Sequence, residues 1–258
     1  MTKRIAAITF NTFREAVRDR VLYNLIVFAF LMIGSSLLLG QITIGVQRQL
    51  LINLGLTAIS LFGVLIAIFI GIGLVSKEID KRTLYTVLTR PVQRWEFILG
   101  KFFGLVVTLV VNAGLMTLGF FAALLYLMRG LEHSDVYILE AIYFILLQFM
   151  IVTAIALLLS AFSTPIESAV LTFAIFVVGS FSEDLRGFAA AAQGVSHYIA
   201  VGMTYLVPNF SALNVISSVA HGNPVAGNVL LLNTAYGLLY AGAVVCGASL
   251  IFQNRNLK

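Results

Sequence analysis

Apolar runs long enough to cross a lipid bilayer are the feature that most constrains this chain. A transmembrane helix needs about 20 consecutive, predominantly apolar residues. Six segments approach or exceed that length with little or no charge, and we expect each to span a membrane: residues 21–42, 50–76, 102–128, 137–159, 165–182 and 228–252. Because only helices and closed barrels satisfy every backbone polar group inside lipid, these runs predict an all-α polytopic membrane protein.

The composition of the chain agrees with this class and excludes several others. The 258 residues are 60% hydrophobic and only 10% charged, whereas soluble domains are about 45–50% apolar and about 25% charged. This balance excludes a soluble enzyme, a disordered tail and a secreted module built on disulfides. The single cysteine, Cys246, excludes an intramolecular disulfide and a multi-cysteine zinc site, and we expect no metal site.

The distribution of lysine and arginine predicts the orientation of the chain. With a cytoplasmic N-terminus, the inward segments are residues 1–20, 77–101, 160–164 and 253–258. They hold all of the 16 Lys and Arg residues except Arg48, Arg129 and Arg186. The positive-inside rule therefore places both termini in the cytoplasm. The long first apolar run is expected to be a retained span in an inner or plasma membrane. The net charge of +5 then reflects topology and does not indicate nucleic-acid binding.

Residues 1–20 are expected to form an amphipathic helix. Ala6, Phe10, Phe13 and Val17 recur at helical spacing, and basic residues occupy other parts of the helical wheel. A basic amphipathic segment beside a span is typical of a helix that lies in the membrane interface. The alternative is a short solvated leader.

Residues 183–227 are expected to form re-entrant or surface helices on the outer side. Residues 187–207 are apolar enough to be a seventh span, but that span would move Arg255 and Lys258 to the outside. Pro208 and Pro224 also interrupt the segment. We therefore favour helices that enter from the outer side and return. No linker or repeat divides the chain, so residues 1–258 are predicted to form one membrane domain.

Two short motifs predict local packing. Thr164 and Glu167, with a proline between them, form the pattern of a capping box that opens the fifth span. Gly100 and Gly104 lie four residues apart and would let another helix approach the start of the third span closely.

The polar groups inside the spans are few and uncharged. Asn112, Gln148 and Asn233 are the main ones, which disfavours an ion-coupled transporter with buried carboxylates. These amides either line a substrate path or form hydrogen bonds between helices. The chain carries no Walker A, zinc-protease or serine-hydrolase motif, so we expect no catalytic residues and no enzyme activity from this chain alone.

The charged segment 77–101 is the most informative loop. Glu78 precedes Lys81 and Arg82 by three and four residues, which favours a helix. Arg90 precedes Pro91, and the residue before a proline disfavours the helical conformation, so the helix should end there. The loop either sets the topology or docks a cytoplasmic partner.

Two elements carry a resemblance to a known family. The first consists of Glu78, Arg82-Thr83-Leu84, the run from Leu88 to Arg94, and Gly100-Lys101. The second runs from Leu206 to Phe210 and is followed by Asn214. Together they resemble ABC-2 permeases, the membrane subunits of ABC exporters, in particular the permease branch of nitrous-oxide-reductase maturation.

The resemblance implies partners and roles for named residues. It implies a second permease chain in a homodimer and cytoplasmic ABC ATPase subunits that hold ATP and Mg²⁺, with no cofactor on this chain. Coupling to the ATPase would fall to a coupling helix and its flanks, namely Glu78, Asp80, Lys81, Arg82, Arg90, Pro91 and Arg94. An outer gate would include Pro208, Asn209, Phe210 and Asn214.

Two other function classes stay open at this point. One is a secondary transporter or channel that works without ATP, and the other is an ABC-type mechanical transducer that transports nothing. The substrate also stays open, because apolar spans suit either a hydrophobic or amphipathic cargo or a closed helix interface.

Overall fold

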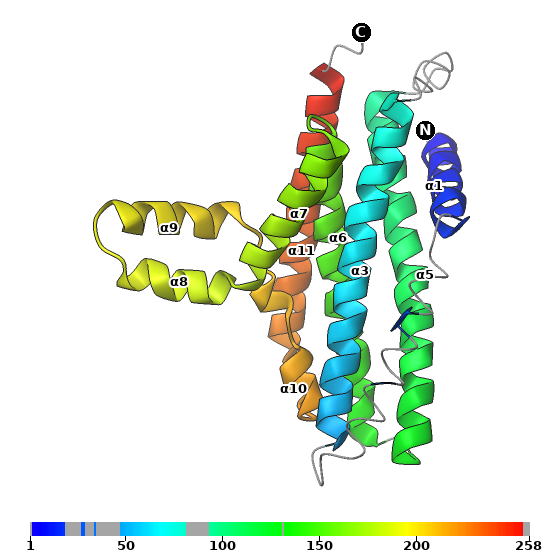
Figure 1. Ribbon diagram of the computed structural model, residues 1–258, viewed down its shortest axis with the longest axis vertical. Coiled ribbons are helices and arrows are strands. Elements are labelled where there is room, and N and C mark those ends of the chain that lie inside the picture. The colour runs from blue at the N-terminus through cyan, green and yellow to red at the C-terminus, as the bar shows by residue number, and fades with distance from the viewer. Residues whose placement is uncertain are drawn as a thin grey trace.

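The computed structural model describes residues 2–18, 27–28, 34, 47–80, 93–130 and 132–254. All regular elements within these ranges are helical, which confirms the predicted all-α class (Figure 1). In chain order they are α1 (Thr2–Arg18), α3 (Gln47–Asp80), α5 (Arg94–Met128), η1 (His133–Tyr137), α6 (Ile138–Ser160), α7 (Pro165–Ser180), α8 (Ser182–Ala191), α9 (Val195–Leu206), η2 (Ser211–Leu213), α10 (Ile216–Ala220) and α11 (Gly227–Asn254).

Four long helices carry segments that are apolar enough to cross a membrane. These segments are Gln47–Gly73, Trp95–Met128, His133–Ser160 and Gly227–Phe252, and they match four of the predicted spans. The first predicted span, 21–42, lies mostly outside the described residues. The fifth, 165–182, corresponds to α7, which is followed after a 66° bend by α8. The described helices therefore provide four candidate spans, or up to six if each bent pair of helices crosses as one unit.

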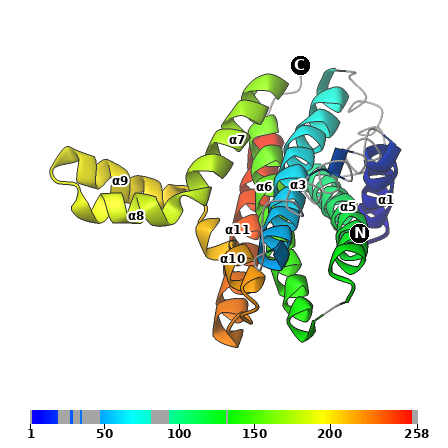
Figure 2. The same cartoon turned by 60° about the horizontal axis from the view of Figure 1, so that its bottom comes forward.

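The segment after α7 leaves the bundle as a helical hairpin. Figures 1 and 2 show α8 and α9 side by side and antiparallel, projecting away from the long axis of the bundle. Gly194 joins them with φ of +66°, a backbone conformation that glycine adopts without strain. The candidate seventh span, 187–207, is thus divided between two short helices. Their predicted re-entrant or surface position on the outer side stays a prediction. A second bent pair, α9 with the η2–α10 segment, turns by 44°.

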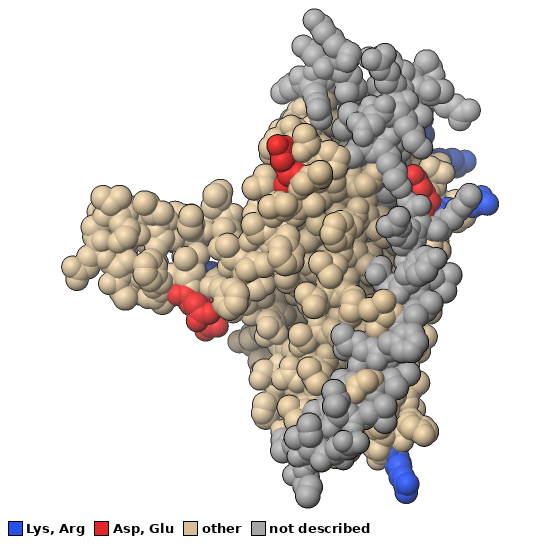
Figure 3. All heavy atoms as spheres, viewed as in Figure 1, with Lys and Arg blue, Asp and Glu red and all other residues tan. Residues whose placement is uncertain are grey.

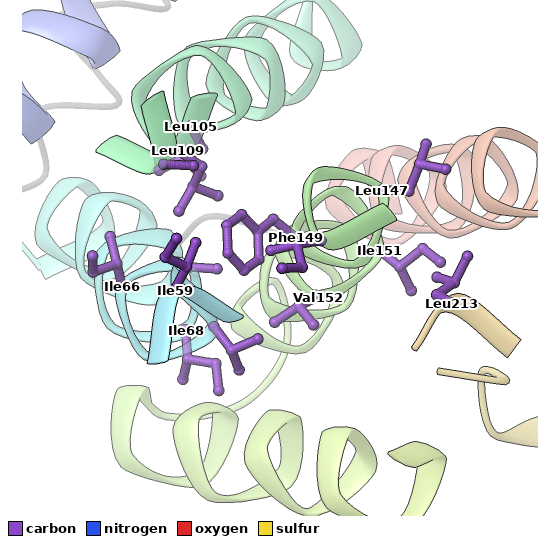
Figure 4. Packing of buried hydrophobic residues seen from close by; sticks show 14 of the residues in the cluster. Ile59, Ile66, Ile68, Leu105, Leu109, Leu147, Phe149, Ile151, Val152 and Leu213 are labelled. Atoms are coloured by element: carbon purple, nitrogen blue, oxygen red, sulfur yellow. The ribbon is translucent and has the colours of Figure 1, made fainter. Parts of the chain in front are cut away.

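Helix α6 forms the centre of the bundle, in contact with α3, α5, α7 and α11. Its side chains are buried on nearly all sides, as expected of a helix that is hydrophobic all round. Figure 4 shows Phe149 of α6 between α3 and α5. The ring lies against Gly63 of α3, where any Cβ atom would overlap it. Close contact of α3 and α6 therefore depends on this pairing of glycine with phenylalanine.

Helix α1 packs along the beginning of α5. A Cβ atom at Gly100 would lie 2.6 Å from Ile8, and one at Gly104 would lie 2.5 Å from Thr12. The Thr9 hydroxyl also donates to the Gly100 carbonyl at 3.3 Å. The close approach predicted at this glycine pair is confirmed, and its occupant is the amphipathic N-terminal helix. The predicted position of α1 in the membrane interface stays a prediction.

Ion pairs flank the contact between α1 and α5. Arg4 lies 4.0 Å from Glu96, and Glu15 lies 3.8 Å from the buried ammonium of Lys101. At the opposite end of the bundle, Arg48 at the start of α3 pairs with Glu132 at 3.1 Å and with the buried carboxylate of Asp135. Between the two ends, the described residues on the face drawn in Figure 3 are mostly uncharged, as expected of a surface that meets lipid.

The capping box predicted before α7 is confirmed. The Glu167 amide donates to the Thr164 hydroxyl at 3.4 Å, and the Thr164 amide donates to the Glu167 carboxylate at 3.1 Å. Pro165 occupies the first helical position, where its missing N–H costs no hydrogen bond. This cap makes the turn from α6 into α7 tight.

Candidate functional site

A small pocket with polar walls lies between α3, α6, α7 and the segment that precedes α11. Its volume is about 180 Å³. The hydrogen-bonding side chains on its wall are uncharged: Thr57, Ser60, Gln148, Ser180 and Asn214. Phe176, Phe210 and Leu213 are among the apolar side chains that complete it. The pocket thus brings together one residue predicted for the substrate path and two predicted for the outer gate.

Gln148 holds a central position in this pocket. Its side chain is buried in α6, and its Nε2 atom donates to the Ser60 hydroxyl of α3 at 3.3 Å. This bond joins two helices, and the same side chain lines the pocket. Both roles that the sequence left open, a hydrogen bond between helices and a place on a substrate path, are therefore compatible with its geometry.

The other two amides predicted for the path lie elsewhere. Asn112 is buried in α5, and neither atom of its amide has a hydrogen-bond partner among the described residues. Asn233 of α11 donates to the Ala212 carbonyl at 2.7 Å, which ties α11 to the outer segment. Neither residue lines the pocket, so the structure does not bring the three amides together.

Asn209 organises the segment predicted to be the outer gate. Its side-chain oxygen accepts hydrogen bonds from the Ser182 hydroxyl at 2.5 Å and from the Ala212 amide at 3.1 Å. Its own backbone N–H donates to the Tyr236 hydroxyl at 2.7 Å. One residue therefore connects the start of α8, the η2 turn and α11.

Phe210 and Pro208 press the same segment against α7. The Phe210 amide donates to the Gly179 carbonyl at 3.1 Å, and its ring centroid lies 5.5 Å from that of Phe176. A Cβ atom at Gly179 would lie 2.5 Å from the Pro208 carbonyl oxygen. Gly179 therefore permits the contact that closes the pocket. Asn214, the fourth gate residue, accepts from the Ile216 amide at 3.3 Å and so helps to start α10.

Most of what was predicted for ATPase coupling falls outside the part of the chain that the structure describes. This applies to Lys81, Arg82, Arg90 and Pro91 and to the side chains of Glu78, Asp80 and Arg94.

The backbone of α3 extends into the charged segment. Helix α3 continues without a break to Asp80. Glu78 and Asp80 therefore belong to the last turns of this long helix, and their coupling role stays a prediction. Arg94 begins α5, where the Gln93 amide donates to the Glu96 carboxylate at 3.1 Å.

Several pocket residues carried no signal in the sequence. Thr57, Ser60 and Ser180 are single hydroxyl residues inside apolar runs, where most such side chains bond to the helix backbone. Ser180 does so, with its hydroxyl donating to the Phe176 carbonyl at 2.8 Å. Only the three-dimensional contact of α3 with α7 brings these hydroxyls near Gln148.

Metal-ligating side chains do not gather in the described part of the chain. No group of three or more His, Cys, Asp or Glu residues there is arranged to hold an ion. Two of the three histidines, His197 and His221, each bond to a backbone carbonyl of a nearby residue, at 2.8 and 2.7 Å.

Comparison with known proteins identifies a family. The family model described as ABC-2 family transporter protein matches residues 6–255, which is nearly the whole chain. The match includes the N-terminal helix, the charged segment 77–101, the pocket and α11. No individual curated protein matches the chain significantly.

Proposed function

Because the chain belongs to the ABC-2 transporter family, we propose that it is the permease subunit of an ATP-driven exporter. A separate cytoplasmic ATPase would bind ATP and Mg²⁺, and this chain would provide the path across the membrane. The observation that carries the proposal is the family match over residues 6–255. The absence of a Walker A motif from the sequence agrees with a nucleotide site on another chain.

Helix α3 offers a direct mechanical link between the two parts of this mechanism. It has 34 residues and is therefore about 50 Å long. One end leads into the charged segment proposed to dock on the ATPase, and its other half contributes Thr57 and Ser60 to the polar pocket. A movement of the ATPase that displaced the charged end would be carried along α3 to the pocket.

The energetics of such a device are those of a population shift. ATP binding would favour one arrangement of the two ATPase subunits. The permease chains would change conformation with them only if their two conformations bind this arrangement with different free energies. A homodimer of this chain, both termini in the cytoplasm and a place in the bacterial inner membrane complete the proposal. The concentration of Lys and Arg in the expected inner segments supports this orientation.

The proposal is tested by uncoupling the charged segment. The full chain, carrying an affinity tag, is purified in mild detergent, and co-purifying chains are identified by mass spectrometry. We expect an ABC ATPase whose hydrolysis rises when the permease is reconstituted with it in liposomes. The double substitution of Glu78→Ala and Arg82→Ala should abolish that rise and leave membrane insertion intact.

The matched control carries the same two types of substitution on the α8–α9 hairpin. Glu183→Ala with Arg186→Ala removes one acid and one base that are both exposed, far along the chain from the charged segment. Stimulation should persist in this control. Normal stimulation in the Glu78 and Arg82 variant would refute the coupling role, and transport without any ATPase would indicate a secondary transporter or channel.

A further inference from the structure

Two neighbouring spaces lie along the seam between α3 and α7, and together they are called the groove: the polar pocket and a second space nearer the capped start of α7. The second space has a volume of about 600 Å³. Its wall includes Leu65, Phe69 and Gly73 from α3, and Ile166, Val170 and Phe173 from α7. On each helix the two spaces are about one turn apart. On α3, Leu61 lines the pocket and Leu65 lines the wider space. On α7, Phe176 lines the pocket and Phe173 lines the wider space. Figure 1 shows the two helices that form these walls.

The residues that line both spaces form one stripe on each helix. On α3, Thr57, Leu61, Leu65, Phe69 and Gly73 recur at intervals of four, so they follow one i, i+4 row that winds around the helix. The stripe covers the 17 residues from Thr57 to Gly73 and therefore extends about 24 Å. Since α7 runs antiparallel to α3, its stripe starts at Pro165 opposite Gly73 and ends at Ser180 near Thr57. The two spaces thus lie end to end along the α3–α7 seam.

The polarity of the groove changes once along its length. Among the described residues, the pocket end presents only uncharged hydrogen-bonding groups, and the wide end is lined only by apolar side chains. The hydrogen bond from Gln148 to Ser60 uses one amide hydrogen and leaves the Gln148 carbonyl oxygen available to a ligand. A charged ligand group would lose hydration in this pocket without gaining a counterion, which is unfavourable.

We propose that this groove binds a neutral amphipathic molecule with a single hydrocarbon chain. Its hydroxyl- or amide-bearing head lies in the pocket near Gln148, and its chain lies along the apolar part between α3 and α7. The inference rests on the proposed function, because it names the class of substrate for that pathway. Small-molecule sites commonly occupy about 300–1,000 Å³, and the apolar part alone falls within that range.

A second copy of this chain is the competing occupant. A helix from another subunit would cover the apolar stripe, but it would leave the hydrogen-bonding groups of the pocket without a matching partner. The gradation from polar to apolar along one groove therefore favours a molecule that is itself polar at one end. The test below distinguishes the two occupants.

The probe is a monoacylglycerol that carries a photoreactive diazirine near the end of its acyl chain. The full chain is reconstituted in nanodiscs with this probe, illuminated and digested, and labelled peptides are mapped. Two comparison probes carry the same diazirine on a fatty acid and on a plain alkane. We expect labelling to concentrate on residues 65–73 and 165–173, and to exceed that of either comparison probe about fivefold, the factor expected from one or two hydrogen bonds.

Two pairs of variants test the two ends of the groove. Gly73→Leu places a side chain in the apolar part and should reduce labelling there about fivefold. Gly114→Leu is its control, because neither glycine has any atom within 4 Å of a Cβ position and only Gly73 lines the groove. Gln148→Leu should lower monoacylglycerol labelling to the level of the alkane. Asn112→Leu, a buried amide outside the pocket, should leave it unchanged.

Contrary outcomes are equally specific. Equal labelling by all three probes would overturn the role of the pocket, and labelling spread evenly over α5 and α11 would overturn the groove as a site. Cross-links between two copies along α3 and α7 that exclude the probe would assign the groove to a dimer contact. Labelling requires neither ATP nor an ATPase. If labelling fails while the permease still stimulates the ATPase, the proposed ligand is refuted and the proposed function is not.

Discussion

The two faces of α3 differ in how they meet their neighbours. Toward α6 the contact is closed, since Gly63 leaves space that the Phe149 ring fills completely. Toward α7 the contact is open, and no atom of the described residues lies within 4 Å of the Cβ position at Gly73. On the same helix, Gly63 thus allows close packing against a neighbour, and Gly73 leaves open space beside it. The closed face fixes α3 to the core, and the open face leaves room for a ligand or for movement against α7.

The largest expected effect comes from a large residue on the closed face. Gly63→Leu would drive a side chain into the Phe149 ring, and overpacking a tight core costs about 3 kcal/mol or more when the backbone has to shift. We expect loss of monodisperse protein in detergent, or a clear fall in the thermal unfolding temperature of any that remains. Both are measured by fluorescence-detected size exclusion with heating.

The same substitution on the open face is the control. Gly73→Leu adds the same side chain to the same helix where it meets nothing, so its stability should stay within about 0.5 kcal/mol of the parent protein. Equal destabilisation by both variants would show that the α3–α7 seam is closed in the membrane. The contrast between the two faces would then be wrong.

A smaller effect is expected where the polar end of the seam is closed by the outer segment. Gly179→Ala would place a methyl group 2.5 Å from the Pro208 carbonyl oxygen, and the strain should cost about 1–3 kcal/mol. This strain would weaken the contact between the outer segment and α7. Faster hydrogen exchange is therefore expected at the Phe210 amide, which donates to the Gly179 carbonyl. Exchange is measured by mass spectrometry on peptides that cover residues 206–214.

A glycine on the hairpin provides the matched comparison for that measurement. Gly187→Ala adds a methyl group in α8 at a position with no atom within 4 Å, so exchange at Phe210 should not change. Unchanged exchange in the Gly179 variant as well would mean that the outer segment is not held by this contact. The pocket would then be open at both ends.

Much of the architecture could be predicted from the sequence because bilayer thickness imposes length and polarity on each span. Four spans, the amphipathic N-terminal helix, the capping box at Thr164 and the close approach at Gly100 and Gly104 all follow from local patterns. A change of direction near residue 182 was expected, since the fifth span was predicted to end there, but the 66° bend itself was not predicted. The contacts of Pro208 and Phe210 with Gly179, just before the bend, are tertiary and leave no local sequence pattern.

The candidate site was less predictable for the same physical reason. Its wall extends from Thr57 to Asn214, and single hydroxyl or amide residues in apolar helices give no pattern that pairs them. Gln148 stood out because an amide is rare in a span, and Phe210 and Asn214 were implied by resemblance to permeases. Asn112 carries the same amide group as Gln148 but lies outside the pocket. Only the packing of the helices decides which of the two amides faces the pocket.

The smallest expected effect concerns the other closed contact, that of α1 with α5. If close packing stabilises closed contacts, the hydrogen bond from Thr9 to the Gly100 carbonyl should matter little. Thr9→Val keeps the shape and should cost about 0.6 kcal/mol, the average for polar contacts between membrane helices. Gly104→Val would instead place atoms within 2.5 Å of Thr12, so α1 should detach, as measured by protease access to residues 2–18. If protease cleaved Thr9→Val as readily as Gly104→Val, the hydrogen bond, and not glycine-mediated packing alone, would hold α1 on α5. The distinction between closed and open faces would then apply to α3 alone.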